Sequence, residues 1–86
     1  MKSIPPFADW RDHITTDEGV LTGKPIIKGT RISVELVLDN FASGWDFRDV
    51  LEAYPHLTRN QVQAALSFAA EVITEARPAG IRKAMR

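Results

Sequence analysis

Apolar residues recur at helical spacing in three separate runs through the second half of the chain. The three apolar faces are Val34, Val37, Leu38 and Phe41; Phe47, Val50, Leu51 and Tyr54; and Val62, Leu66, Ala69, Val72 and Ile73. Residues three and four apart lie on the same side of a helix, so each run predicts an amphipathic helix that faces a core. The predicted helices span residues 34–43, 47–54 and 59–76.

Each predicted helix begins at a residue whose side-chain oxygen can cap free backbone amides. These residues are Ser33, Asp46 and Thr58. Thr58 also forms a capping-box pattern with Gln61. In all three cases the residue before the cap and the fourth residue after it are apolar, the pattern of a hydrophobic staple. The staple pairs are Ile32 with Val37, Trp45 with Val50, and Leu57 with Val62.

The predicted helix ends are marked by residues that stop a helix. Gly44 can adopt the left-handed conformation that closes the first helix. Pro55 ends the second helix and Pro78 the third, because proline lacks the amide that a helix interior needs.

The first half of the chain alternates turn signals with short β-prone runs. Residues 17–19, 22–25 and 28–30 are turn-forming and separate Val20–Leu21, Ile26–Ile27 and Arg31–Ile32. This pattern predicts one or two tight hairpins within residues 14–32. A two-stranded ribbon is marginal in water, so its isoleucines must pack on the helices or pair with a second chain.

Together these elements predict a mainly α fold in which an N-terminal β-hairpin precedes a three-helix, homeodomain-like helix-turn-helix. We divide the chain into an N-terminal extension (residues 1–13), one domain (14–76) and a basic C-terminal tail (77–86). A chain of 86 residues without cysteine has a small core and no disulfide to support it. We therefore expect a homodimer or a hetero-oligomer.

Charge and hydropathy narrow the class of protein. Eleven basic and eleven acidic side chains cancel, so any contact with DNA must be local. No run approaches the ~20 apolar residues that cross a bilayer, and no signal segment is evident. We expect a soluble cytoplasmic protein with no membrane contact.

The sequence offers little catalytic chemistry. His13 and His56 have no partners at a metal-ligand or triad spacing and are expected at the surface or in turns. Residues 23–30 resemble a phosphate-binding loop, but the lysine precedes the second glycine, so a turn is the simpler interpretation and a phosphate or nucleotide site the weaker one. Asp46 and Asp49 suit a helix N-terminus. Glu71 and Glu75 lie near a helix C-terminus, where we expect basic groups of the tail or of a partner to hold them. We predict no enzyme activity, metal or cofactor.

The start of the third helix carries side chains suited to reading bases. Arg59, Asn60, Gln63 and Ser67 can contact base edges if this helix enters a major groove. Phosphate contacts would come from Arg48, Lys24, Lys28, Arg31 and the tail. The alternative is that these are ordinary solvated positions on a module that binds protein without binding DNA.

The third helix also has a wider apolar side than a three-helix core needs, because Ala64, Ala65, Phe68 and Ala70 extend it. The hairpin, a second copy of the chain or a different protein would cover the excess. The residues predicted to contact a partner are Phe68, Val72, Arg77 and Arg82. Phe7 and Trp10 lie before the domain, where covering the core is their default role.

Several segments resemble one known family. They are Gly19-Val20, the stretch Gly23-Lys24-Pro25-Ile26-Ile27-Lys28-Gly29-Thr30-Arg31-Ile32, then Ala42-Ser43-Gly44, Tyr54-Pro55-His56-Leu57-Thr58 and residues 64–70. Over residues 14–71 the chain is similar to the domain-of-unknown-function 433 (DUF433) family, and residues 23–32 are the specific part of the match.

The resemblance implies a VapB-like antitoxin of a toxin–antitoxin pair, with a homeodomain-like helix-turn-helix. Such a protein would neutralise a cognate toxin, a PIN-like ribonuclease, and repress its own operon by binding operator DNA. Family members tend to have acidic residues where this chain has Asn60 and Gln61, a difference that favours DNA contact here.

Overall fold

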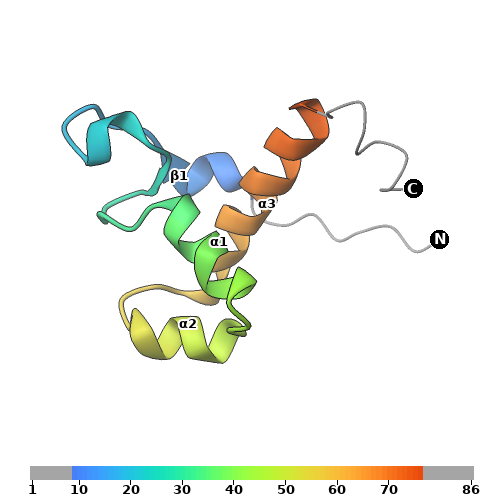
Figure 1. Cartoon of the computed structure of the whole chain (residues 1–86). Helices are drawn as coiled ribbons and strands as arrows, with labels where there is room; N and C mark the ends of the chain where they lie inside the picture. The colour runs from blue at the N-terminus through green and yellow to red at the C-terminus, as the bar shows by residue number, and fades with distance from the viewer. Residues whose placement is uncertain (1–8, 77–86) are drawn as a thin grey trace.

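The computed structural model describes residues 9–76. In chain order these residues form η1 (Trp10–Asp12), β1 (Ile14–Thr15), η2 (Leu21–Gly23), β2 (Ile26–Ile27), α1 (Val34–Ala42), α2 (Phe47–Ala53) and α3 (Arg59–Ala76). Figure 1 shows the β-hairpin at one end of α1 and α2 at the other, with the long α3 running past both. The predicted fold class, a hairpin followed by three helices, is confirmed.

All three predicted helix caps are present. The hydroxyl of Ser33 accepts a hydrogen bond from the amide of Leu36 at 2.9 Å. Thr58 and Gln61 form the reciprocal capping box, at 3.2 Å and 2.8 Å. A second capping box, which the sequence pattern did not predict, joins Asp46 to Asp49 at 2.9 Å in both directions. Each helix therefore begins with one free amide of its first turn satisfied by a side chain three residues before it.

The helix ends differ slightly from the predicted ones. Helix α1 ends at Ala42 and α2 at Ala53, one residue earlier than predicted. Gly44 has φ +97°, as expected for the glycine that closes a helix. Its amide donates to the carbonyl of Phe41 at 3.0 Å, and the amide of Trp45 donates to the carbonyl of Asn40 at 3.1 Å. These two bonds form a Schellman motif, which ends α1 by occupying its last carbonyls.

The two strands form a short antiparallel pair that is tied to α1. Ile14 pairs with Ile27 and Thr15 with Ile26. The amide of Val34 donates to the carbonyl of Pro25 at 3.0 Å, which fixes the first turn of α1 beside β2. The predicted hairpin across residues 28–30 is present: Ile26 forms an antiparallel bridge with Ser33, and the amide of Ile27 donates to the carbonyl of Ile32 at 3.0 Å. The sequence did not specify the second pairing of β2, which is with β1.

The prediction of a β-prone run at Val20–Leu21 was wrong. The carboxylate of Asp17 accepts from the amide of Gly19 at 2.8 Å and turns the chain there, leaving Val20 in an isolated bridge. Leu21, Thr22 and Gly23 then all have positive φ, at 51°, 52° and 83°. Side chains rarely adopt this left-handed conformation, because Cβ approaches the backbone too closely. The connection between β1 and β2 is therefore a strained left-handed turn.

Valines at equivalent helix positions form the centre of the core. Val37, Val50 and Val62 are each 0% exposed, as is Ile27 of β2. Each of the three valines is the fourth residue after a helix cap, so each is the inner member of a predicted staple. Their outer partners differ: Ile32 and Leu57 pack with the core, whereas Trp45 is 36% exposed.

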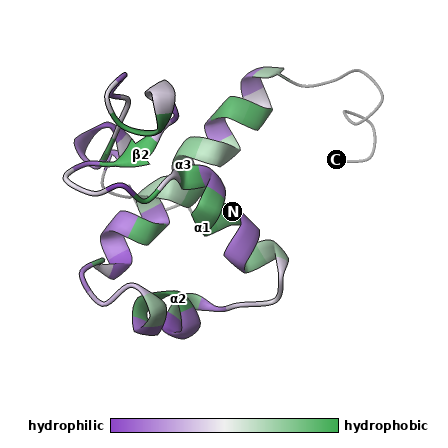
Figure 2. Ribbon diagram, turned by 60° about the vertical axis from the view of Figure 1, so that its left-hand side comes forward, coloured by the Kyte–Doolittle hydropathy of each residue, from purple (hydrophilic) through white to green (hydrophobic). Residues whose placement is uncertain are grey.

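The C-terminal half of α3 departs from the predicted core face. Val72 and Ile73 were predicted to be buried, but they are 45% and 49% exposed. Helix α3 extends beyond the other helices at this end (Figure 1), and within residues 9–76 these two side chains line an open groove and are not packed in the core. Figure 2 shows hydrophobic residues continuing along this end of α3. No helix within residues 9–76 is both long and apolar enough to cross a membrane.

Candidate binding surfaces

The polar side of α3 begins beside α2 and carries the residues predicted to read bases. Asn60 is exposed, and Gln63 and Ser67 are half-buried. The guanidinium carbon of Arg59 lies 4.1 Å from the centre of the Phe47 ring, in a cation–π contact with α2. Arg48 is exposed on α2 itself. Arg48 and Arg59 lie beside the junction of α2 and α3, and Asn60, Gln63 and Ser67 follow along the first half of α3.

The remaining predicted phosphate contacts lie elsewhere. Lys24, Lys28 and Arg31 are exposed on the hairpin side of α1, at the opposite end of that helix from α2 (Figure 1). Helix α1 alone is about 13 Å long. Lys24 also pairs with Glu35 of α1, with Nζ 3.2 Å from Oε1. The structure therefore does not bring the predicted DNA-contacting residues together on one surface; it divides them into two groups.

An apolar groove of about 230 Å³, the α1–α3 groove, runs between these helices. It is lined by Lys24, Pro25, Val34, Glu35, Leu38, Phe68, Ala69, Val72 and Ile73. Two of the predicted partner contacts, Phe68 and Val72, belong to this lining. The other two, Arg77 and Arg82, lie outside the described residues.

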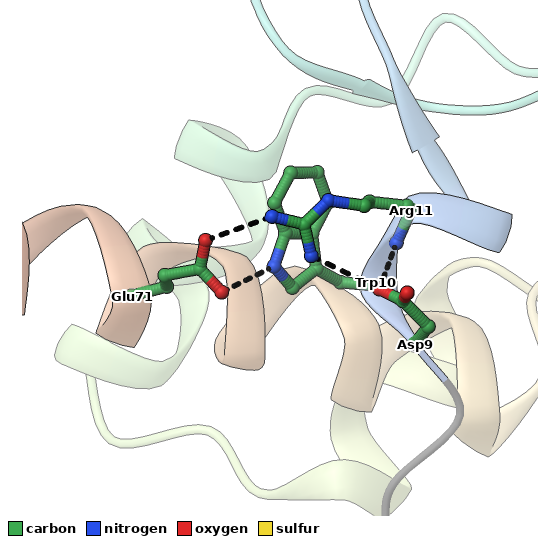
Figure 3. A network of polar contacts seen from close by, with 4 residues as sticks. All are labelled: Asp9, Trp10, Arg11 and Glu71. Carbon is green, nitrogen blue, oxygen red and sulfur yellow. Dashed lines mark hydrogen bonds and ion pairs between the residues drawn. The ribbon is translucent and has the colours of Figure 1, made fainter.

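Trp10 packs against α3 at Phe68 and Glu71. Its ring meets Phe68 edge to face, with centroids 4.8 Å apart and an interplanar angle of 77°. Its Nε1 donates to Glu71 at 3.0 Å, as Figure 3 shows. Ala64, one turn before Phe68, is 1% exposed. The default role of Trp10 as a cover for the core is confirmed, while Phe7 lies outside the described residues.

Glu71 is held by residues that precede β1. Trp10 and Arg11 bind its two carboxylate oxygens, and Arg11 Nη2 lies 3.2 Å from Oε2 (Figure 3). The basic tail, which was expected to hold Glu71, lies outside the described residues. Arg11 also binds Asp9: its backbone amide donates to Oδ1 at 3.0 Å and lowers the pKa of that carboxyl below its ordinary value. Residues 9–11 are thereby fastened to α3 by both packing and charge.

A second hollow lies on the hairpin side of α1. This hairpin cleft has a volume of about 480 Å³ and is lined by Leu21, Thr22, Lys24, Arg31, Ser33 and Leu36. Lys24 lines both this cleft and the α1–α3 groove, so the two hollows adjoin. Sequence reasoning did not single out Leu36 or Leu21, which are 39% and 38% exposed. Leu36 lies off the apolar face of its helix, and that position is the signal that could have identified it.

The residues weighed for catalysis stay apart. His13 follows η1 and is half-buried, and His56 is exposed in the turn before α3. Among residues 9–76, no three histidine, cysteine, aspartate or glutamate side chains are grouped so that they could hold a metal ion. The features that these residues present for interaction are the two hollows and the polar start of α3.

Comparison with known proteins identifies relatives of unknown activity. The family described as "Protein of unknown function (DUF433)" matches residues 14–69. The match begins after Trp10 and ends before Val72. A curated protein of Sinorhizobium fredii (strain NBRC 101917 / NGR234), "Uncharacterized protein y4eO", is 32% identical over 59 residues, which are 69% of this chain and 27% of that protein. The chain thus matches little more than a quarter of this relative. No solved structure matches the chain.

Proposed function

The chain belongs to the DUF433 family of proteins of unknown function, and from this premise we propose that it is a non-enzymatic, antitoxin-like protein that binds and neutralises a partner toxin, a PIN-like ribonuclease. The observation that supports this proposal best is the α1–α3 groove. Its walls are almost entirely apolar, and Val72 and Ile73 at its edge are 45% and 49% exposed. Apolar side chains grouped around a hollow are typical of surfaces that bind protein.

The groove suits an amphipathic segment of the toxin. Such a segment would insert one or two aliphatic or aromatic side chains between α1 and α3, as in other helix-in-groove complexes. The energy would come from covering Val72, Ile73 and the groove walls. A central contact of this kind typically contributes at least 1 kcal/mol, about a fivefold change in Kd.

Neutralisation is tested with the purified product of the neighbouring gene, the candidate toxin. We expect an excess of the protein to abolish cleavage of a fluorescent RNA, and Val72→Glu and Ile73→Glu each to weaken inhibition about tenfold or more, because each buries an unpaired charge in the interface. Thr74→Glu is the matched control: Thr74 is exposed on the same helix but does not line the groove. A toxin that stays fully active with excess protein would refute the proposed function.

Binding to operator DNA is a second function, favoured by the open polar side of α3. Within residues 9–76, no hydrogen bond to another residue occupies the side chain of Asn60 or Gln63, whereas Gln61 is used by the capping box. Arg48 and Arg59 flank this side, and the hairpin cations are too far away to join them. With two phosphate contacts per chain, log Kd would change with log salt by a slope of only about 2.

Fluorescence anisotropy with labelled promoter DNA at two salt concentrations tests this second function. We expect Asn60→Ala to lose site-specific binding and Lys28→Ala to retain it. Equal affinity for promoter and unrelated DNA would refute operator recognition, and no binding to either DNA would favour the alternative function, a protein-binding or dimerisation module that does not bind DNA.

A further inference from the structure

The hairpin cleft is chemically different from the groove that adjoins it. Lys24 and Arg31 bring two cationic side chains to its lining, and Leu21 and Leu36 bring two exposed aliphatic ones. No aromatic side chain lines it. The cleft therefore combines positive charge with aliphatic surface and offers no ring on which a nucleobase could stack.

Two backbone turns bring the cations together. The turn at residues 28–31 reverses the chain and so returns Arg31 to the neighbourhood of Lys24. The hydroxyl of Thr30 stabilises that turn by donating to the carbonyl of Ile27 at 2.7 Å and accepting from the amide of Ile32 at 3.0 Å. The left-handed turn at residues 21–23 places Leu21 and Thr22 on the opposite wall.

The charges of the cleft are available to a ligand. Among residues 9–76, Arg31 has no acidic side chain within ion-pairing distance. Lys24 pairs with Glu35, but the two side chains are 56% and 67% exposed. An exposed pair of this kind is weak and exchanges easily for another partner. A ligand carboxylate could thus bind the guanidinium of Arg31 in the bidentate geometry that arginine favours.

We propose that the hairpin cleft binds a short acidic and aliphatic segment of a partner protein. The carboxylate of the segment pairs with Arg31 and Lys24, and an adjacent aliphatic side chain packs between Leu21 and Leu36. Because Lys24 lines both hollows, one continuous segment can occupy the cleft and the α1–α3 groove together. The identification of that partner as the toxin rests on the proposed function; the chemistry of the cleft does not.

The cleft is tested without the toxin, by NMR titration of the isotope-labelled protein with capped pentapeptides. The probes are LEELL, its basic counterpart LKKLL and its polar counterpart SEESS, with a short single-stranded oligonucleotide as the nucleic-acid arm. We expect LEELL to shift the amide signals of Leu21, Thr22, Arg31 and Leu36. We expect Arg31→Gln to weaken this binding about fivefold or more. Lys28→Gln removes an exposed cation that lines neither hollow, and we expect it to change the binding less than twofold.

The alternative results overturn the proposal. Equal binding of LKKLL would show that charge does not select the ligand, and equal binding of SEESS would show that the leucines do not. Stronger shifts with the oligonucleotide at these residues would make the cleft a nucleic-acid site, and an absence of shifts with every probe would leave it without a ligand. Binding of LEELL by a protein that fails to inhibit the toxin would refute the proposed function and support the proposal that this cleft binds an acidic and aliphatic segment.

Discussion

Replacing Trp10 tests whether the segment before β1 belongs to the folded domain. Trp10 lies outside the family match, yet its ring packs on Phe68 and its Nε1 donates to Glu71. A half-buried indole covers on the order of 100 Å², which corresponds to about 2.5 kcal/mol. The edge-to-face contact and the hydrogen bond each add about 1 kcal/mol. Because such areas are upper bounds, we expect Trp10→Ala to cost about 3 kcal/mol.

A loss of that size is large for a domain this small, whose total stability is expected to be about 5–8 kcal/mol. It corresponds to a fall in Tm of about 12–24 °C. Urea denaturation followed by far-UV circular dichroism measures it without relying on tryptophan fluorescence. Trp10→Phe should retain the ring contact with Phe68 but lose the bond to Glu71, and should cost about 1 kcal/mol.

The two substitutions together make the reasoning refutable. If Trp10→Ala and Trp10→Phe both stay within about 0.5 kcal/mol of the parent protein, the segment contributes nothing to the fold. If both cost the same large amount, the hydrogen bond to Glu71 dominates and the packing on Phe68 does not.

Three further predictions concern the helices. Val62→Ala truncates a side chain that is 0% exposed and should lower the free energy of unfolding by about 2 kcal/mol in urea denaturation. Val72 is already 45% exposed, so Val72→Ala should lower it by less than about 0.5 kcal/mol. Equal losses of stability would contradict the assigned core. Thr58→Ala breaks one half of a capping box and should lower stability by about 1 kcal/mol, with amide hydrogen exchange accelerated first at the start of α3. The backbone amide of Asp49 lowers the pKa of the Asp46 carboxyl below its ordinary value of 3.8, so this carboxylate stabilises the fold above that value and loses its contribution as the pH falls through the lower, folded-state pKa. Asp46→Asn keeps a capping oxygen that does not titrate, so it should lose less stability than the parent protein between about pH 4 and pH 2; an unchanged acid transition would show that the cap does not titrate in this range.

The helices were predictable because their signals are local. Each cap at Ser33, Asp46 and Thr58 is a hydrogen bond between residues three apart, so the sequence contains both partners side by side. The fourth residue after each cap then turns inward by helix geometry alone, which is why the central valines could be identified. Gly44 was recognisable for the same reason, since its left-handed conformation closes a helix through bonds that span only a few residues.

The candidate site was less predictable. The polar start of α3 follows from helical periodicity, but the positions of the predicted phosphate contacts do not. Lys24, Lys28 and Arg31 are basic, like Arg48, yet the fold places them at the other end of α1. The hairpin cleft depends on a left-handed turn at Leu21 and Thr22, where neither side chain favours that conformation. The sequence predicted a turn at residues 22–25, but it carries no signal for a left-handed conformation at Leu21 and Thr22.

By itself, then, the sequence determined where each helix begins, where α1 and α2 end to within one residue, and that the valine four residues after each cap faces inward, because those choices depend on hydrogen bonds and periodicity within about one helical turn. Tertiary structure decided what covers α3. Trp10 and Glu71 are 61 positions apart, and only the folded chain brings them within 3.0 Å. Val72 and Ile73 repeat the apolar spacing of the buried residues but line an open groove instead of packing closely against a second element of residues 9–76, so they remain at the surface. Periodicity shows which side of a helix is apolar, whereas burial requires a second element to lie against it.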